Sequence, residues 1–191
     1  MRRARRYAIA SGLAIAAVGG SVAALELPYV NWKTVVPPLA SQPLIIRHDA
    51  KGDGRFEAPR SGNRKHRGVD LAGELDAPVR AVRSGRVLEV GTHRGLGRFV
   101  VLQHDQGVRT LYAHLNTAYV REGERIAQGR VIGTIGKTGN ARHPWITPHV
   151  HLEVTRNGAP IDPQSLGLQF QAPDTATTET SDARGGEWAA A

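Results

Sequence analysis

The 191-residue chain contains no cysteine. It therefore has no disulfide framework and no cysteine for lipid attachment, and no thiolate competes with histidine for a metal ion. The residue pattern shows neither a convincing amphipathic helix nor an internal repeat. Aromatic residues make up only 5% of the chain, and helix-turn-helix, zinc-finger and aromatic RNA-binding signatures are absent. We therefore expect no nucleic-acid partner, although the chain is basic.

The net charge of +8 comes mainly from the middle of the chain. Residues 45–170 contain 19 Lys or Arg and 12 Asp or Glu, whereas residues 171–191 contain one Arg and four acidic residues. A basic folded region suits an anionic polymer as its partner. Plain solubility is the alternative explanation of the same charge.

Four arginines lie among the first six residues, and 19 uncharged residues follow at positions 7–25. This order is typical of a secretory signal peptide, and Ala24 offers a cleavage site. The alternative is an uncleaved membrane anchor, because 19 uncharged residues nearly span a bilayer. We expect an exported protein of the periplasm or cell envelope, either released or anchored to the inner membrane.

Composition divides the remainder into a Pro-containing linker at residues 26–43, a folded domain at 44–170 and a disordered tail at 171–191. Short apolar, β-branched runs separated by Gly-rich turns predict an all-β domain. The predicted strands cover residues 79–82, 86–90, 99–103, 108–112, 130–135 and 149–155. Residues 105–107 and 157–158 have the composition of tight turns.

Four histidines and one aspartate fall in three short stretches: residues 66–70, 112–115 and 149–151. Apolar residues alternate with His149 and His151, which predicts a strand with both imidazoles on one face. Gly68 and its β-branched neighbour argue against a helix, so we place Asp70 on a strand and His66 on the loop before it. Such a set can hold one zinc ion and leave histidines for chemistry.

In the order and composition of these stretches, the chain resembles the lysostaphin-type zinc endopeptidases, which cut peptidoglycan cross-bridges. The similarity runs over about residues 55–163. It is carried by residues 66–72, 77–81, 84–87, 112–115, 129–133, 136–139 and 148–153.

The resemblance implies that His66, Asp70 and His151 bind one zinc ion, and that His114 and His149 are catalytic histidines outside the metal shell. All five are present, which argues against a degenerate relative that has lost zinc. We therefore predict a zinc-dependent endopeptidase of peptidoglycan. We expect a monomer whose antiparallel strands form a two-sheet open sandwich with a groove for the zinc site.

The chemistry of such a site follows from the ion. Zinc lowers the pKa of its bound water to about 7 and polarises the scissile carbonyl. We assign His149 to the water proton and His114 to the oxyanion, and leave an exchange of these roles open. Glu153 lies on the same strand face and either orients an imidazole or is an ordinary surface carboxylate.

The segment 140–147 departs from the family, which commonly has a short Gly-rich link at this place. It contains Trp145, which either forms a wall for the substrate or plugs the edge of the domain. We expect the remaining four histidines to be structural or solvated. These are His48, His93, His104 and His143.

Two other functions stay open at this stage. The first is a cell-wall-binding or amidase-activating factor without catalysis, which the zinc content of the purified protein would test. The second is a zinc peptidase that acts on a secreted protein or peptide. Digestion of purified sacculi compared with casein would separate this from an enzyme of the cell wall.

Overall fold

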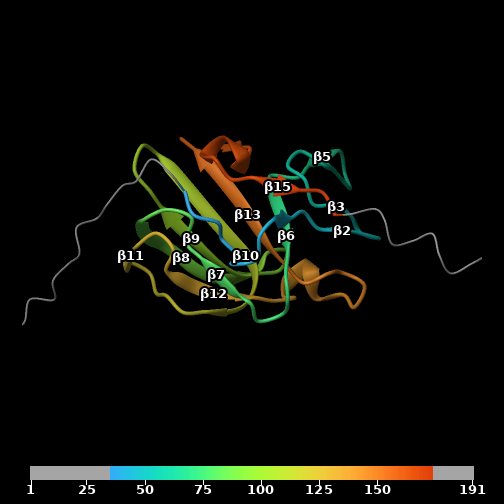
Figure 1. The fold of residues 1–191 in the computed structure, drawn as a ribbon, viewed down its shortest axis with the longest axis horizontal. Coiled ribbons are helices and arrows are strands. Elements are labelled where there is room, and N and C mark those ends of the chain that lie inside the picture. The colour runs from blue at the N-terminus through green and yellow to red at the C-terminus, as the bar shows by residue number, and fades with distance from the viewer. Residues whose placement is uncertain (1–34, 174–191) are drawn as a thin grey trace, which may run out of the picture.

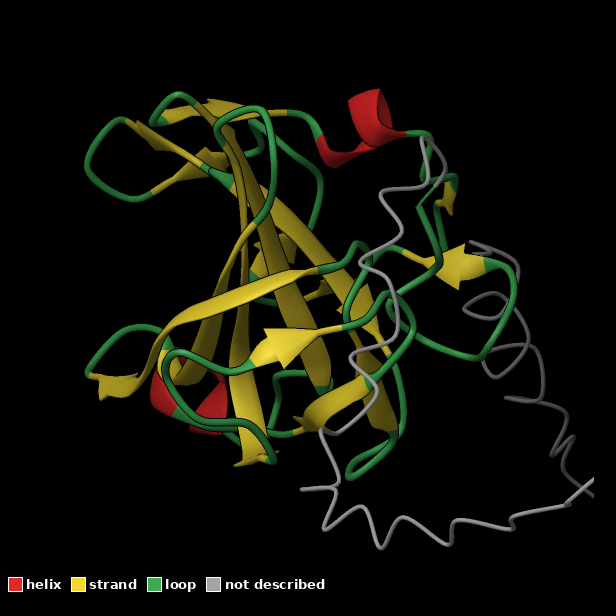
Figure 2. Ribbon diagram, turned by 90° about the vertical axis from the view of Figure 1, so that its left-hand side faces the viewer, coloured by secondary structure: helices red, strands yellow, loops and turns green. Residues whose placement is uncertain are grey.

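The computed structural model describes residues 35–173, so the predicted signal or anchor and nearly all of the predicted tail lie outside the described residues. Strands form almost all of the regular structure (Figures 1 and 2). They are β1 (Leu44–Ile45), β2 (His48–Asp49), β3 (Gly52–Asp53), β4 (Pro59–Arg60), β5 (Arg64–Lys65), β6 (Gly68–Ala72), β7 (Pro78–Arg80), β8 (Gly85–His93), β9 (Gly97–Gln103), β10 (Val108–Ala118), β11 (Arg125–Ile126), β12 (Val131–Ile135), β13 (His149–Arg156), β14 (Ala159–Ile161) and β15 (Phe170–Gln171). Two short 3-10 helices, η1 (Gly139–Arg142) and η2 (Pro163–Leu166), complete this part of the chain. Within residues 35–173, neither helix is long and apolar enough to cross a membrane.

The six strands predicted from the sequence are present as β7, β8, β9, β10, β12 and β13, and β8 and β10 run several residues further than expected. Both predicted turns are also present. Residues 105–107 join β9 to β10, and residues 157–158 join β13 to β14. The central turn residues have the positive φ values that two-residue hairpin loops require: Gln106, Gly107, Asn157 and Gly158.

Nine strands form one antiparallel sheet that branches at β10. Along one edge, β10 pairs with β9. Along the other edge its first half, residues 108–113, pairs with β13, and its second half, residues 115–118, pairs with β12. One arm then continues from β13 to β6 and β14, and the other from β12 to β7 (Figure 1). The predicted all-β antiparallel fold is confirmed. The arm with β13, β6 and β14 and the arm with β12 and β7 belong to one branched sheet.

The hydrophobic core collects side chains from both arms. On β13, Val150 and Leu152 are completely buried in this core, as the alternation in the sequence predicts. On the neighbouring β6, Val69 and Leu71 belong to the same core. The polar residues between them therefore point to the other face of this arm, where the predicted site lies.

Part of the predicted linker packs on the domain. Leu39 is 3% exposed and belongs to the core, and the backbone of residues 36–38 exchanges hydrogen bonds with Arg80 and Val82. At the other end, Gln171 pairs in parallel with Ile45. The packed region thus begins upstream of Leu44, where the sequence pattern places its start. The pattern misses this segment because isolated apolar residues between prolines have no period.

Candidate active site

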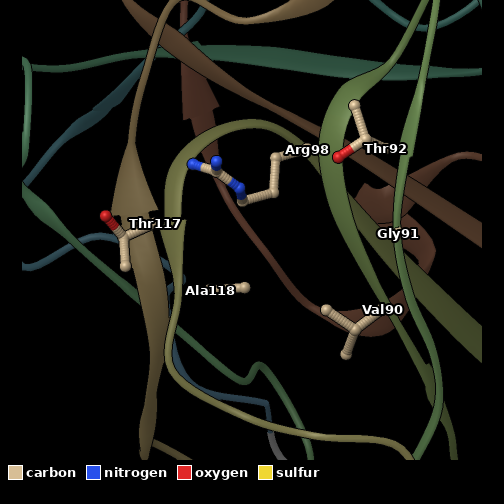
Figure 3. Close-up of a pocket in the computed structure, with 6 residues that line it drawn as sticks. All are labelled: Val90, Gly91, Thr92, Arg98, Thr117 and Ala118. Carbon is tan, nitrogen blue, oxygen red and sulfur yellow. The ribbon is translucent and has the colours of Figure 1, made fainter.

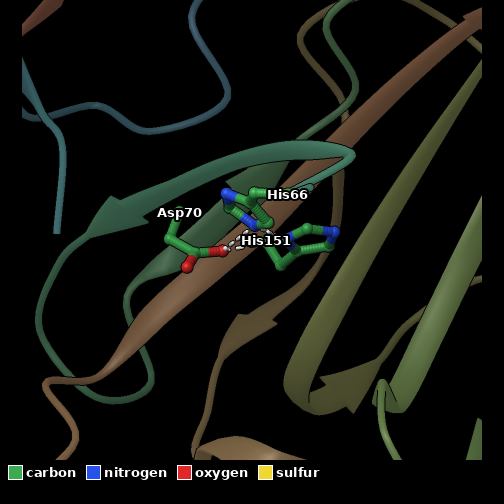
Figure 4. Close-up of side chains that lie close together, drawn as sticks. All are labelled: His66, Asp70 and His151. Atoms are coloured by element: carbon green, nitrogen blue, oxygen red, sulfur yellow. Dashed lines mark hydrogen bonds and ion pairs between the residues drawn. The ribbon is translucent and has the colours of Figure 1, made fainter. Parts of the chain in front are cut away.

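The side chains of His66, Asp70 and His151 converge on one point (Figure 4). His66 lies between β5 and β6, and Asp70 stands directly opposite His151 in the β6–β13 pair. His66 Nε2 is 3.1 Å from Asp70 Oδ1 and 3.0 Å from His151 Nδ1, which is itself 2.7 Å from Asp70 Oδ1. All three residues are buried. The structure therefore brings together the three metal ligands that the resemblance implies.

The outward nitrogen of each histidine in this cluster is already engaged. His66 Nδ1 donates to the carbonyl oxygen of Arg55 at 2.8 Å, and His151 Nε2 donates to Glu153 Oε1 at 3.1 Å. These contacts orient the rings so that Nε2 of His66 and Nδ1 of His151 face inward. Glu153 thus contacts His151 directly. Of the two roles that the sequence allows for Glu153, this contact favours orienting the imidazole over being an ordinary surface carboxylate.

The donor set fits a zinc ion. Zinc bonds of about 2.0–2.1 Å to nitrogen and carboxylate oxygen in a tetrahedron place neighbouring ligand atoms about 3.3 Å apart. The separations of 2.7–3.1 Å among the three inward atoms are only slightly smaller. A shift of a few tenths of an ångström in each side chain is sufficient to accommodate the ion.

Asp70 is tied to a buried network on its other oxygen. Its Oδ2 accepts from Arg47 Nη2 at 2.9 Å and from Arg47 Nε at 3.3 Å, and Arg60 approaches to 3.5 Å. Arg47, which is 6% exposed, also donates to Asp49 Oδ1 at 2.6 Å. The second oxygen of Asp49 accepts from the backbone N–H of Thr147 at 3.0 Å. A continuous chain of contacts therefore links His66, Asp70 and His151 to the segment just before β13. These three residues, whose donor atoms fit one metal ion, are called the metal cluster below.

The charges of this cluster are coupled in the absence of a metal ion. Burial disfavours the Asp70 carboxylate, but hydrogen bonds from His151 and His66 outweigh burial and hold its pKa well below the usual value. Burial also opposes the charged form of His151, and here the hydrogen bonds to Asp70 and Glu153 raise its pKa to about 9. In the metal-free protein the positive charge therefore lies on the His151 ring, between Asp70 and Glu153, and a metal ion bound at Nδ1 would take the place of one of its protons.

His114 and His149 stand beside the cluster. Their ring centroids are 4.9 Å apart, and His149 Nε2 is 4.0 Å from Asp70 Oδ1. His149 Nδ1 donates to the Thr147 carbonyl at 2.6 Å, and His114 Nδ1 donates to the Thr138 carbonyl at 2.9 Å. With Nδ1 protonated, the lone pair of each neutral imidazole is on Nε2.

Both of these histidines are neutral near pH 7. Burial, together with neighbouring His149 and His151, lowers the pKa of His114 to about 3. Burial likewise lowers the pKa of His149, against the opposing effect of Asp70. Each ring can therefore accept a proton at Nε2 and return it later.

A bulge in β10 aims His114 at the site. In a regular strand Tyr112 and His114 share a face, and Tyr112 is fully buried in the core. The register with β9 shifts between Tyr112 and Leu115, and His114 adopts a φ of 62°. This extra residue turns the His114 side chain out of the core and onto the face of the metal cluster. Positive φ at a non-glycine residue is a strained conformation that is frequent at functional sites.

Two glycines allow the loop that supports His114. Gly97 and Gly139 both have positive φ, and a Cβ on either would clash with the facing backbone or with Thr138. Their close approach brings the Thr138 carbonyl to His114 Nδ1. The hydroxyl of Thr138 also donates to the Leu115 carbonyl at 3.0 Å and so anchors the bulge. This gives residues 136–139, one of the stretches similar to the lysostaphin-type peptidases, a structural role in positioning His114.

All five residues open into one groove with a volume of about 1170 Å³. His93 and His143 also line it, His48 is exposed away from its lining, and His104 is buried between Ser84 and Thr110. A second, smaller hollow of about 480 Å³ contains none of the histidines (Figure 3). It lies among Val90, Gly91, Thr92, Arg98, Thr117 and Ala118. The groove around the metal cluster is therefore the candidate site.

Trp145 does not belong to the core. Its side chain is 55% exposed and stacks on His143 with ring centroids 5.1 Å apart. The ammonium group of Lys51 lies 5.8 Å from its ring. Trp145 thus stands beside the groove, although its neighbours His143 and Ile146, rather than Trp145 itself, line it.

A buried His–Asp–His cluster with two further imidazoles in an open groove is the arrangement of a metal-dependent hydrolase. Residues 64–163 match the sequence pattern of Peptidase family M23. The chain belongs to this family, and its relationship to the lysostaphin-type peptidases is confirmed.

Curated relatives share the domain but are longer. The DD-carboxypeptidase/endopeptidase Mpg of Neisseria meningitidis serogroup B is 40% identical over 105 residues, which are 55% of this chain and 23% of the relative. The peptidoglycan DD-endopeptidase ShyB of Vibrio cholerae is 30% identical over 116 residues, covering 61% and 26%. The lipoprotein NlpD/LppB homolog of Pseudomonas aeruginosa is 36% identical over 111 residues, covering 58% and 35%. The chain therefore spans about a quarter to a third of the length of these relatives.

Solved structures share the fold. The catalytic domain of the antimicrobial peptidase lysostaphin from Staphylococcus simulans superposes with a TM-score of 0.53 at 30% identity, over 62% of this chain and 92% of that domain. A zinc-containing peptidase from Vibrio cholerae gives a TM-score of 0.55 at 26% identity, over 75% of this chain and 40% of that structure.

The buried Arg47 gives a first test. Arg47→Met removes the cation between two carboxylates, Asp70 and Asp49, whose side chains are only 5% and 10% exposed. We expect the free energy of unfolding of the metal-free protein to fall by about 3–5 kcal/mol, as when a buried ion pair loses one partner. Urea denaturation measures this. Arg64→Met, on the exposed surface of β5, is the control, with an expected change within about 0.5 kcal/mol. Equal stability of both variants would contradict the role of Arg47.

Proposed function

We propose that this protein hydrolyses peptide cross-links of bacterial peptidoglycan, with one zinc ion held by His66, Asp70 and His151. The convergence of three ligand atoms within a groove, each oriented from behind, carries the proposal. Relatives named as DD-endopeptidases, peptidoglycan DD-endopeptidases among them, support the substrate class. The basic surroundings of the groove suit stem peptides, which have free carboxylates.

Bound zinc supplies a Lewis acid and an acidified water to such a site. His149, with its lone pair on Nε2 and 4.0 Å from Asp70 Oδ1, is placed to accept the proton of the attacking water. His114, on the neighbouring bulge, is placed to donate a hydrogen bond from Nε2 to the developing oxyanion after Nε2 takes up a proton from solvent, while Nδ1–H stays bonded to the Thr138 carbonyl. The proton that His149 accepted from the water later leaves with the amine of the cleaved bond.

The complete donor set favours this function over a binding or activating factor without catalysis. A factor of that kind needs a surface that recognises its partner. It has no need for two neutral imidazoles backed by carbonyl oxygens beside a buried carboxylate. A zinc peptidase of secreted proteins shares the same residues and differs only in what fits the groove.

The metal assignment has a direct test. The purified full chain should contain one zinc ion, and Asp70→Ala or His151→Ala should remove most of it, because three protein ligands are needed for tight binding. Metal analysis by mass spectrometry measures the content. His48→Ala, an exposed histidine outside the groove lining, is the control. Full zinc content in a variant without Asp70 or His151 would mean that other residues bind the metal.

The two remaining histidines should separate chemistry from metal binding. His149→Ala and His114→Ala should retain zinc and lose roughly 10²- to 10⁴-fold in kcat on purified sacculi, the usual contribution of a positioned acid–base group. His114→Asn is a second variant, because asparagine tolerates positive φ and so preserves the bulge. Release of soluble fragments measures turnover, again with His48→Ala as control. Near-normal turnover in both single variants would remove the pair from the mechanism.

We further propose that residues 1–25 export the protein to the cell envelope, where peptidoglycan lies. The arginine-rich start and the uncharged stretch after it support this. Fusing residues 1–40 to a reporter that is active only outside the cytoplasm should give signal. Replacing Arg2, Arg3, Arg5 and Arg6 with glutamate should abolish it. A native protein found only in the cytosol would contradict export.

A further inference from the structure

The lining of the groove is strongly asymmetric in charge. All of its Arg and Lys side chains come from residues 47–67, whereas the lining residues between 93 and 146 include no charged side chain apart from titratable histidines. The positive charge is densest on the hairpin formed by β4 and β5 and the residues that follow it. We call residues 59–67 the basic hairpin. Its cations are Arg60, Arg64, Lys65 and Arg67.

The carboxylates of the groove neutralise only part of this hairpin. Asp70 and Glu153 are the acidic residues among the described lining residues. Asp70 is paired with Arg47 and Arg60, and Glu153 with His151, while Arg67 only reaches Glu153 at 4.0 Å.

Two cations at the rim remain available to a ligand. Arg64 donates from Nε to the Ser61 carbonyl, and no described carboxylate lies within ion-pair distance of it. Lys65 is 68% exposed, and among the described carboxylates Glu57, itself 57% exposed, is the one within ion-pair distance. An ion pair between two exposed side chains is worth little and is easily exchanged for a better acceptor. The outer part of the hairpin therefore presents an arginine fork and an ammonium group beside the metal cluster.

We propose that the basic hairpin binds a free carboxylate of the stem peptide and so makes the enzyme selective for cross-links between acidic rather than amidated stems. This inference rests on the proposed function and names the chemistry of its substrate. Arg64 and Lys65 directly precede the metal ligand His66. Both side chains line the same groove as the three ligand residues, so the bound carboxylate belongs to a substrate residue near the scissile bond. The arginine fork matches a carboxylate in shape, and the concave site strengthens the attraction.

The test uses two pairs of synthetic peptides, one cross-linked and one not. Within each pair, the stem carboxylates are either free or amidated. The zinc-loaded full chain should bind the uncross-linked free acid about tenfold more tightly than its amide at low salt, as two exposed charge pairs allow. The same preference should appear in kcat/KM on the cross-linked pair, through KM. It should shrink toward one in high salt, since the pairs are solvent-accessible.

A double variant and a charge-matched control separate the hairpin from overall charge. Arg64→Gln with Lys65→Gln should bring both preferences close to one, while the zinc content stays unchanged. Arg86→Gln with Arg109→Gln removes the same charge from exposed positions outside the groove lining and should preserve the preferences. Equal binding of free and amidated peptides by the wild type would overturn the proposal, as would equal loss in the control. Selective binding without any cleavage would uphold the hairpin and overturn the proposed hydrolysis instead.

Discussion

Asp70 places a carboxylate in a position that is 4% exposed, and the surrounding residues keep that charge paired on both sides. One oxygen faces His66 and His151, and the other faces Arg47 and Arg60. A buried charge without partners would be strongly destabilising. The arginines, supplied by a segment before the M23 match, satisfy the outer oxygen and leave the inner one for a metal. Asp70, a proposed metal ligand, is therefore also part of the buried ion-pair network of the domain.

The branch in the sheet explains how the remaining histidines reach this cluster. β10 changes partner from β13 to β12 at the bulge that contains His114. The same irregularity that divides the sheet into two arms thus turns His114 out of the core. Thr138, positioned by the close approach of Gly97 and Gly139, supports the ring from behind. Fold and site share one structural feature, so a change that made β10 regular would turn His114 toward the hydrophobic core and remove it from the groove.

Much of this arrangement follows from local sequence. Alternation around His149 and His151 predicts their shared face, and the turn residues predict both hairpins, because these features depend on neighbours in the chain. The contact of Arg47 with Asp70 spans 23 residues and has no local signal. Strand alternation would place His114 beside Tyr112 in the core, and the bulge that prevents this depends on pairing with β9 and β12. The burial of Leu39 likewise has no local signal, because it comes from contacts with the folded sheet rather than from a periodic pattern in residues 35–43.

Mass spectrometry of the products from defined, cross-linked muropeptides tests the central claim most directly. If the zinc-loaded chain is a cross-link endopeptidase, each dimer should give two monomers whose masses sum to the dimer plus one water. This conversion should stop when a chelator removes the metal and resume when zinc is restored. A dimer that persists unchanged with zinc bound, or products cut only in the glycan, would contradict the account.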